Sequence, residues 1–130
     1  MNRIEDKKLK PKLFLNELLA IVSEVTGVQQ YEIRGKRRVA KIRRARHLFS
    51  FIAWEHGHKK LHISKLLNQN HSTTISAINN VMFEMRLYAA NKDYLTMHHL
   101  RMIIDKIEIM MIEKAIFAEL EIERSLKDAS

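Results

Sequence analysis

Four residues are the only glycines and prolines in this chain of 130 residues: Pro11, Gly27, Gly35 and Gly57. Folds with many strands need glycine and proline at their turns, so this scarcity favours long helices. Apolar residues make up 46% of the chain, which is enough to fill a core. A chain of this length is expected to form one domain, here with an appended helix. The sequence therefore predicts an all-α protein.

Apolar residues recur at steps of three and four, which is the spacing of one face of a helix. The expected helices cover residues 13–26, 38–56, 61–67, about 71–90 and 94–126. Gly27 and Gly57 follow the first two and are placed to end them. Tyr31 and Ile33 are expected to anchor the connector over residues 28–35 to the core. The third and fourth helices are joined by a tight polar turn, an arrangement typical of a helix-turn-helix.

Basic residues concentrate in residues 34–65, which hold eleven Lys or Arg against one acid, Glu55. This local balance of +10 exceeds the +8 of the whole chain, so the remainder is slightly acidic. Charge gathered in one quarter of a chain indicates a surface that binds a polyanion. The alternative for an isolated basic stretch is a solvated loop. Here the basic residues continue along the next helix, and DNA or RNA contact is the favoured interpretation.

Two groups of side chains are the candidates for this contact. The first group precedes or lies on the second helix and would reach phosphates or enter the minor groove. It consists of Lys36, Arg37, Arg38, Lys41, Arg43, Arg44 and Arg46. The second group opens the fourth helix with short polar side chains that suit base edges in the major groove. It consists of Asn70, His71, Ser72, Thr73, Thr74 and Ser76. Helix capping by Ser72 and Thr73 is the structural alternative.

Residues 13–85 resemble the C-terminal DNA-binding domain of the chromosomal replication initiator DnaA. The resemblance lies in Lys36-Arg37-Arg38, in Arg44-Ala45-Arg46-His47, and in Ile63 to Leu67 leading to Asn70-His71-Ser72-Thr73. It implies a DnaA domain IV or Trp-repressor-like helix-turn-helix bundle, followed here by a long C-terminal helix. It also implies roles for single residues: Arg38 in the minor groove, Arg46 and His47 at phosphates, His71 and Ser72 at bases, and Thr73 at a phosphate.

The chain also departs from the family's pattern. Asn70 stands where the family has aspartate, and an amide pairs with adenine whereas a carboxylate accepts from cytosine, so the preferred DNA sequence is expected to differ. Ser64 and Asn68 stand where glycines are usual. The chain has no Gly-x-x-x-x-Gly-Lys-Ser/Thr loop, so we expect a free-standing DnaA-like protein without the ATPase module.

The C-terminal segment has a different composition from the rest. Residues 91–130 hold six basic and eight acidic residues. One apolar stripe consists of Ile104, Ile107, Met111, Ala115, Ala118 and Ile122, and a second of Ile109, Ile112, Ile116 and Leu120. A helix that is apolar on two sides must bury both. We therefore divide the chain into a flexible lead-in (1–12), a helix-turn-helix domain (13–90) and a helical extension (91–130) that packs on its own domain and, over residues 94–126, pairs two copies in a homodimer.

Other classes of protein find little support in the residues. The absence of cysteine excludes disulfides and thiolate sites. His56, His58 and His62 are a weak zinc candidate, since Gly57 interrupts them and lysines adjoin them, so a surface or DNA-facing loop is favoured. The chain lacks a nucleophile-elbow sequence and an isolated carboxylate pair, so no enzyme, cofactor or metal site is expected. Without a secretory signal or a run of roughly 18 apolar residues, the expected location is the cytoplasm, with no membrane partner.

The function expected is sequence-specific binding to double-stranded DNA, in replication initiation control or transcriptional regulation. The alternative is a protein-interaction adaptor whose C-terminal helix binds a replication or transcription partner, with only nonspecific affinity for nucleic acid. Structured RNA is a further possibility, but the deep, narrow major groove of A-form RNA suits a recognition helix less well than B-form DNA does.

Overall fold

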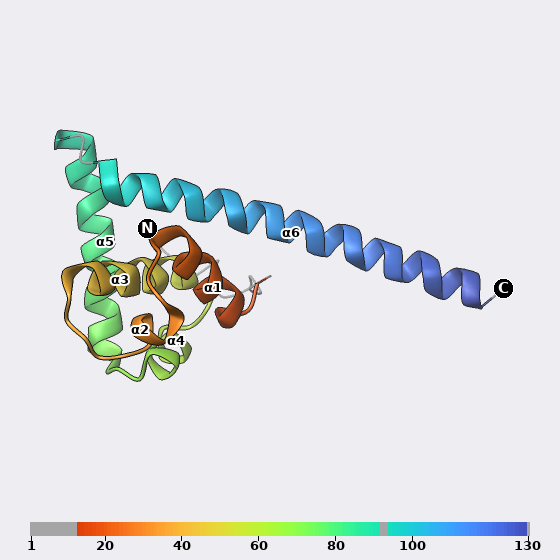
Figure 1. Ribbon diagram of the computed structural model, residues 1–130, viewed down its shortest axis with the longest axis horizontal. Helices are drawn as coiled ribbons and strands as arrows, with labels where there is room; N and C mark the ends of the chain where they lie inside the picture. The colour runs from red at the N-terminus through yellow and green to blue at the C-terminus, as the bar shows by residue number, and fades with distance from the viewer. Residues whose placement is uncertain (1–12, 92–93, 130) are drawn as a thin grey trace.

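The computed structural model describes residues 13–91 and 94–129, and the expected lead-in over residues 1–12 lies outside the described residues. Within those ranges the chain forms helices and no strand (Figure 1). The helices are α1 (Leu15–Thr26), α2 (Gln30–Ile33), α3 (Ala40–Glu55), α4 (Lys60–Leu67), α5 (His71–Asn91) and α6 (Tyr94–Asp128). The predicted all-α class, helix-turn-helix and long C-terminal helix are confirmed.

Local signals in the sequence set where the helices end. Gly27 ends α1 in the left-handed conformation, with φ at 75°, and its N–H donates to the Ser23 carbonyl over 2.9 Å. Asn68 ends α4 in the same conformation, with φ at 52°. Asparagine adopts this conformation more readily than most residues. Asn68 therefore turns the chain from α4 into α5, at a position where the family that the sequence resembles usually has glycine.

The connector between α1 and α3 contains one helical turn, α2, which was not predicted from the sequence. The Gln29 N–H donates to Glu32 Oε1 over 3.3 Å at the start of this turn. Ile33 is fully buried, as expected, whereas Tyr31 is 75% exposed. The prediction that Tyr31 anchors the connector is therefore wrong. On a helical turn, residues two positions apart point to different sides, so only one of the pair faces the core.

The core is built around α3, which packs against α1, α2, α4 and most extensively α5. Leu48, Phe49 and Ala53 of α3 are fully buried. Ile78 and Val81 of α5 belong to the same apolar cluster. The inner face of α3 thus anchors the fold, which leaves its other face to carry the basic residues.

The first half of α6 belongs to the core, and the second half projects away from it (Figure 1). Leu100, Ile103 and Ile107 are buried against the domain, where α6 packs on α1 and α5. From residue 115 to residue 129 every side chain is exposed. Of the first predicted apolar stripe only Ile107 is buried and Met111 half-buried, while the second stripe is exposed throughout.

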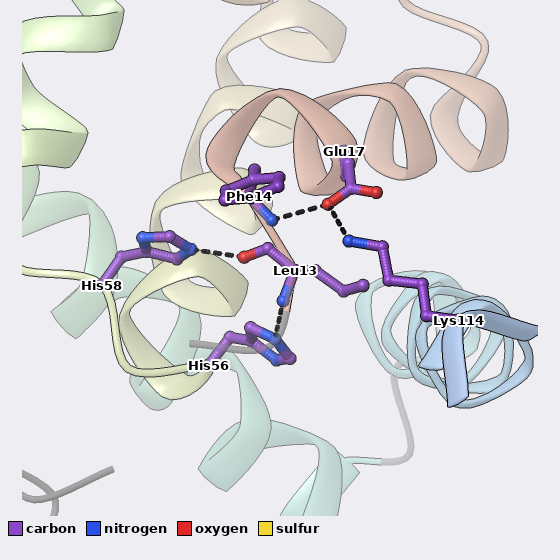
Figure 2. Close-up of polar contacts among 6 residues, drawn as sticks. All are labelled: Leu13, Phe14, Glu17, His56, His58 and Lys114. Carbon is purple, nitrogen blue, oxygen red and sulfur yellow. Dashed lines mark hydrogen bonds and ion pairs between the residues drawn. The ribbon is translucent and has the colours of Figure 1, made fainter. Parts of the chain in front are cut away.

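Two histidines hold the backbone of Leu13 at the start of the described chain, as Figure 2 shows. The Leu13 N–H donates to His56 Nε2 over 3.0 Å, and His58 Nε2 donates to the Leu13 carbonyl over 2.8 Å. His56 must therefore lack a proton at Nε2, while His58 must carry one. These contacts give His56 and His58 a structural role in place of the surface or DNA-facing position expected from the sequence.

An ion pair fastens α6 to the start of α1 (Figure 2). Lys114 Nζ lies 2.6 Å from Glu17 Oε1, an oxygen that also accepts the Phe14 N–H over 2.8 Å. The Lys114 ammonium stands 4.9 Å from the centre of the Phe14 ring. The hydrogen bond from Lys114, followed by that from Phe14, holds the pKa of Glu17 below its ordinary value. This carboxylate is thus favoured in its charged form while α6 is docked.

Glu17→Gln should lower the free energy of unfolding near neutral pH by up to about 1 kcal/mol, the range of partly exposed ion pairs. Because folding depresses the pKa of Glu17, the charged carboxylate stabilises the fold above its unfolded-state pKa of about 4.3. This contribution is lost as the pH falls through the lower pKa that Glu17 has in the folded protein. Urea unfolding at pH 7 and near pH 3 measures the difference from the unchanged protein. The difference should shrink at the lower pH, and a constant difference would contradict this account. Glu119→Gln, on the projecting part of α6, serves as the control.

Candidate nucleic-acid interface

A hollow of about 510 Å³ joins the two groups of side chains singled out in the sequence. One side of it belongs to residues 34–39, here named the basic loop, and to α3. The other side belongs to the turn between α4 and α5 and to the start of α5. The polar residues that line the hollow are Lys36, Arg38, Arg43, Arg46, His47, Asn68, Gln69, Asn70 and Thr73. Segments more than twenty residues apart therefore share one concave, cationic surface.

The basic loop presents its cations to solvent. Lys36, Arg37 and Arg38 are all exposed. Arg37 Nη1 lies 3.8 Å from a Glu32 carboxylate oxygen, but its side chain is 71% exposed. An exposed ion pair of this kind contributes little to stability, so the Arg37 charge remains available to another anion.

The cations of α3 divide between two sides of the helix. Arg43, Arg46 and His47 line the hollow. Lys41 and Arg44, which the sequence analysis placed in the same group, do not line it. Their charges act on His99 of α6, and the Lys41 ammonium lies beside Gly27 at the end of α1. Successive residues on a helix are about 100° apart, so a run of basic residues cannot face one groove together.

Arg46 and His47 are both partly buried, whereas Lys36, Arg38 and Arg43 in the lining of the same hollow are exposed. The Arg46 guanidinium donates to three backbone carbonyls, those of Ile33, Glu32 and Arg37. Burial lowers the pKa of Arg46. Burial also lowers the pKa of His47. The negative charge of Glu84 acts in the opposite direction, and the positive charge of Arg43 adds to the lowering. A neutral His47 at physiological pH can accept as well as donate a hydrogen bond.

The turn before α5 and the start of α5 expose five of the six polar residues predicted there to contact DNA. Asn70, His71, Ser72, Thr73 and Ser76 are exposed. The Asn70 carbonyl accepts the N–H groups of Thr73 and Thr74 and so begins the helix. Asn70 and Thr73 line the hollow, while the other three lie outside its lining.

Thr74 does not share this exposed surface, although it was expected there. Its side chain is 0% exposed and its Oγ1 lies 2.6 Å from Ser64 Oγ. Gln69 Nε2 donates to the same Thr74 oxygen over 2.9 Å. Since the Ser64 hydroxyl donates to the Lys60 carbonyl over 2.8 Å, the Thr74 hydroxyl must donate to Ser64. Thr74 therefore joins α5 to α4, and its position on the inner side of α5 removes it from any contact with DNA.

Two further residues of α5 share its exposed side and were not singled out in the sequence. Asn79 and Asn80 are exposed, and Asn80 follows Thr73 and Ser76 by seven and four residues. Residues at these spacings lie on one side of a helix. An asparagine there has the donor and acceptor that pair with adenine. Extending the helical spacing from Thr73 would have identified Asn80.

Other sites weighed in the sequence have ordinary explanations or no geometric support. Trp54 is half-buried, its ring 6.3 Å from that of Phe51, and Lys60 Nζ lies 5.6 Å from its centre. Among the described residues, no three His, Cys, Asp or Glu side chains gather as they would around a metal ion. A search of the same residues finds no helix with the length and apolar character needed to cross a membrane.

A protein-family model matches about half of the chain. The family model described as the bacterial dnaA protein helix-turn-helix matches residues 15–81, from the first residue of α1 into α5. This range holds the basic loop, the hollow and the exposed start of α5. No curated protein matches the chain. The family match supports DNA binding and does not favour the adaptor alternative.

The hydroxyl pair between α4 and α5 can be tested by a double-mutant cycle. Ser64→Ala and Thr74→Val should each lower the free energy of unfolding by about 1–3 kcal/mol, because each leaves a buried polar group without its partner. The double variant should cost less than the sum of the two, since both hydroxyls are then gone. Urea unfolding measures all three, with Thr73→Val as the exposed control. If the loss of unfolding free energy in the double variant equalled the sum of the two single losses, the proposed pairing would be contradicted.

Proposed function

The chain belongs to the bacterial DnaA-protein helix-turn-helix family, and on that premise we propose that it binds specific sequences in double-stranded DNA. The observation that carries this proposal is the shared hollow, which brings the basic loop and the start of α5 to one surface. A DNA backbone lies between its two grooves, so a protein that reaches both must place its contacts on either side of a phosphate-binding surface.

The proposed mechanism divides the work between the two sides of the hollow. Lys36, Arg38 and Arg43 neutralise phosphates, which releases counterions and supplies affinity without regard to sequence. Arg38 also reaches the minor groove from the basic loop, where a narrow groove attracts arginine. The start of α5 enters the major groove and fixes the sequence.

Base recognition is assigned to the exposed residues at the start of α5. Asn70 and His71 contact base edges, and Ser72 and Ser76 contact bases or the thymine methyl group. Thr73 binds a phosphate in this proposal, which its position in the lining of the hollow supports. Asn70 in place of the family's aspartate favours adenine at its position.

The process served by this binding is replication initiation control or transcriptional regulation. Both need a protein that finds a specific duplex sequence among many nonspecific sites. The proposal places the protein in the cytoplasm, with double-stranded DNA as its partner. Contact with a replication or transcription protein through α6 is compatible with either role.

Two substitutions separate affinity from sequence reading. Arg38→Ala should weaken binding to every duplex and reduce the slope of log K against log salt by about 0.9, the value for one phosphate contact. His71→Ala should leave that slope nearly unchanged and cost about 1–3 kcal/mol of discrimination between a preferred and a scrambled site. Fluorescence anisotropy over a series of KCl concentrations measures both effects.

Arg124→Ala is the matched control, because it removes one exposed cation from the projecting part of α6. It should change neither the slope nor the discrimination. If Arg38→Ala and His71→Ala also changed neither, DNA binding through this surface would be rejected.

We further propose that α6 pairs two copies of the chain. Ile109, Ile112, Ile116 and Leu120 are each more than half exposed, on the side of α6 away from Ile103 and Ile107. Their spacing of three and four residues is that of the apolar seam between paired helices. An unsupported helix end of this length is marginal in water, so the projecting part of α6 gains from a partner.

The distribution of charge favours a second copy meeting at this end of the molecule. The domain face carries the basic loop and would repel its counterpart in another copy. Residues 115–128 carry four acids and two bases, so the projecting part of α6 lacks that repulsion. Pairing there would leave both DNA-binding surfaces free and present two recognition helices to two half-sites.

Ile112→Glu combined with Ile116→Glu should convert a dimer into a monomer, because four carboxylates would meet in the seam. Multi-angle light scattering at micromolar concentration measures the mass, and circular dichroism checks that the helices remain. Glu121→Gln is the exposed control and should stay dimeric. A monomeric mass for the unchanged protein would contradict pairing through α6.

A further inference from the structure

Arg46 differs from the other arginines near the hollow in what its guanidinium contacts. Arg46 Nε donates to the Ile33 carbonyl over 2.8 Å. Its Nη2 donates to the carbonyls of Glu32 over 3.1 Å and Arg37 over 3.2 Å. Three of the five N–H groups of this side chain are thus occupied by backbone acceptors.

These three carbonyls lie on both sides of Gly35. Glu32 and Ile33 end α2, where helical carbonyls lack partners within the helix. Arg37 lies within the basic loop, directly before Arg38. The planar guanidinium of one side chain from α3 therefore joins the two ends of the segment that turns from α2 into the basic loop.

The rest of the basic loop has little burial to hold its shape. Residues 36–40 are all exposed. The ion pair between Arg37 and Glu32 is exposed and long, at 3.8 Å. Three neighbouring cations also repel one another, which favours an open loop in the absence of DNA. The forked contacts of Arg46 oppose that opening.

We propose that Arg46 is a positioning residue, which fixes the basic loop so that Lys36 and Arg38 are presented to DNA, rather than a phosphate contact in its own right. The part of this inference that concerns DNA rests on the proposed function. The part that concerns the loop does not, because the three hydrogen bonds exist in the free protein. Lysine cannot replace Arg46 in this role, since an ammonium on a flexible stem lacks the planar fork.

The test compares Arg46→Lys and Arg46→Met with the control variant Arg101→Lys, at an exposed arginine of α6 outside the lining of the hollow. Arg46→Lys keeps the charge but loses the fork, and Arg46→Met keeps the length of the stem but loses every donor. If Arg46 positions the loop, both variants should weaken DNA binding by about tenfold or more, and both should reduce the salt slope by about two units as the loop cations lose their phosphates. Arg101→Lys should retain both the affinity and the slope.

Hydrogen exchange of the free protein supplies a readout that does not depend on DNA. Amides of residues 34–38 should exchange faster in both Arg46 variants and at the original rate in Arg101→Lys, while those of α1 keep their protection. That protection in α1 separates local opening from loss of the fold. Arg38→Ala added to Arg46→Lys should cost less than the sum of the two, since a displaced loop already lacks the Arg38 contact.

Two results would overturn the proposal. One is an Arg46→Lys variant that binds DNA with the affinity and slope of the unchanged protein while Arg46→Met loses both, which is the behaviour of a phosphate contact. The other is unchanged exchange at residues 34–38 in both variants. Faster exchange in a protein that binds no DNA would uphold the positioning role and reject the proposed function instead.

Discussion

Apolar packing of α3 against α5 holds the two sides of the hollow in position. The inner face of α3 carries Leu48 and Phe49 into the core, where they meet Ile78 and Val81 of α5 in one apolar cluster. The outer face carries the cations that line the hollow. Because protein interiors are close-packed, this contact allows little relative movement of the two helices. The spacing between phosphate-binding cations and the start of α5 is therefore set by apolar packing.

The cations of this surface must stay in water or have hydrogen-bond partners, because an unpaired charge in the apolar core would destabilise the fold. The exposed cations of the basic loop remain hydrated and available to an anion. Arg46 is the exception, because its burial is compensated by backbone carbonyls. Hydroxyl groups make the corresponding contact on the other side of the hollow, where Thr74 and Ser64 join α5 to α4. On both sides of the hollow, polar side chains thus fix the local backbone or helix position through hydrogen bonds within the protein.

Much of the fold could be predicted from spacing and from the positions of the glycines. The helices and the turn between α4 and α5 follow from apolar residues at steps of three and four. The single turn of α2 is too short to show this spacing of apolar residues. The exposed position of Tyr31 could therefore not be predicted from the sequence. The packing of α6 on its own domain was predicted from its apolar stripes, but the residues that it buries were not, since Leu100 and Ile103 belong to neither stripe.

The candidate site was predictable in its residue types and less so in their orientation. The sequence identified the cations of residues 36–47, but their division between two sides of α3 depends on the angle of each residue around the helix. Thr73 and Thr74 are adjacent and chemically identical, yet one is exposed and the other buried. Adjacent residues face different directions on a helix, so the pattern Ser-Thr-Thr alone cannot separate base reading from packing.

The central claim is that one surface of this protein recognises a particular sequence of duplex DNA. Selection of binding sites from a random duplex pool, at a stated salt concentration near the physiological value, tests it most directly. We expect enrichment of one short motif, with adenine where Asn70 meets the major groove. A pool that binds the protein but remains random after repeated rounds would contradict it.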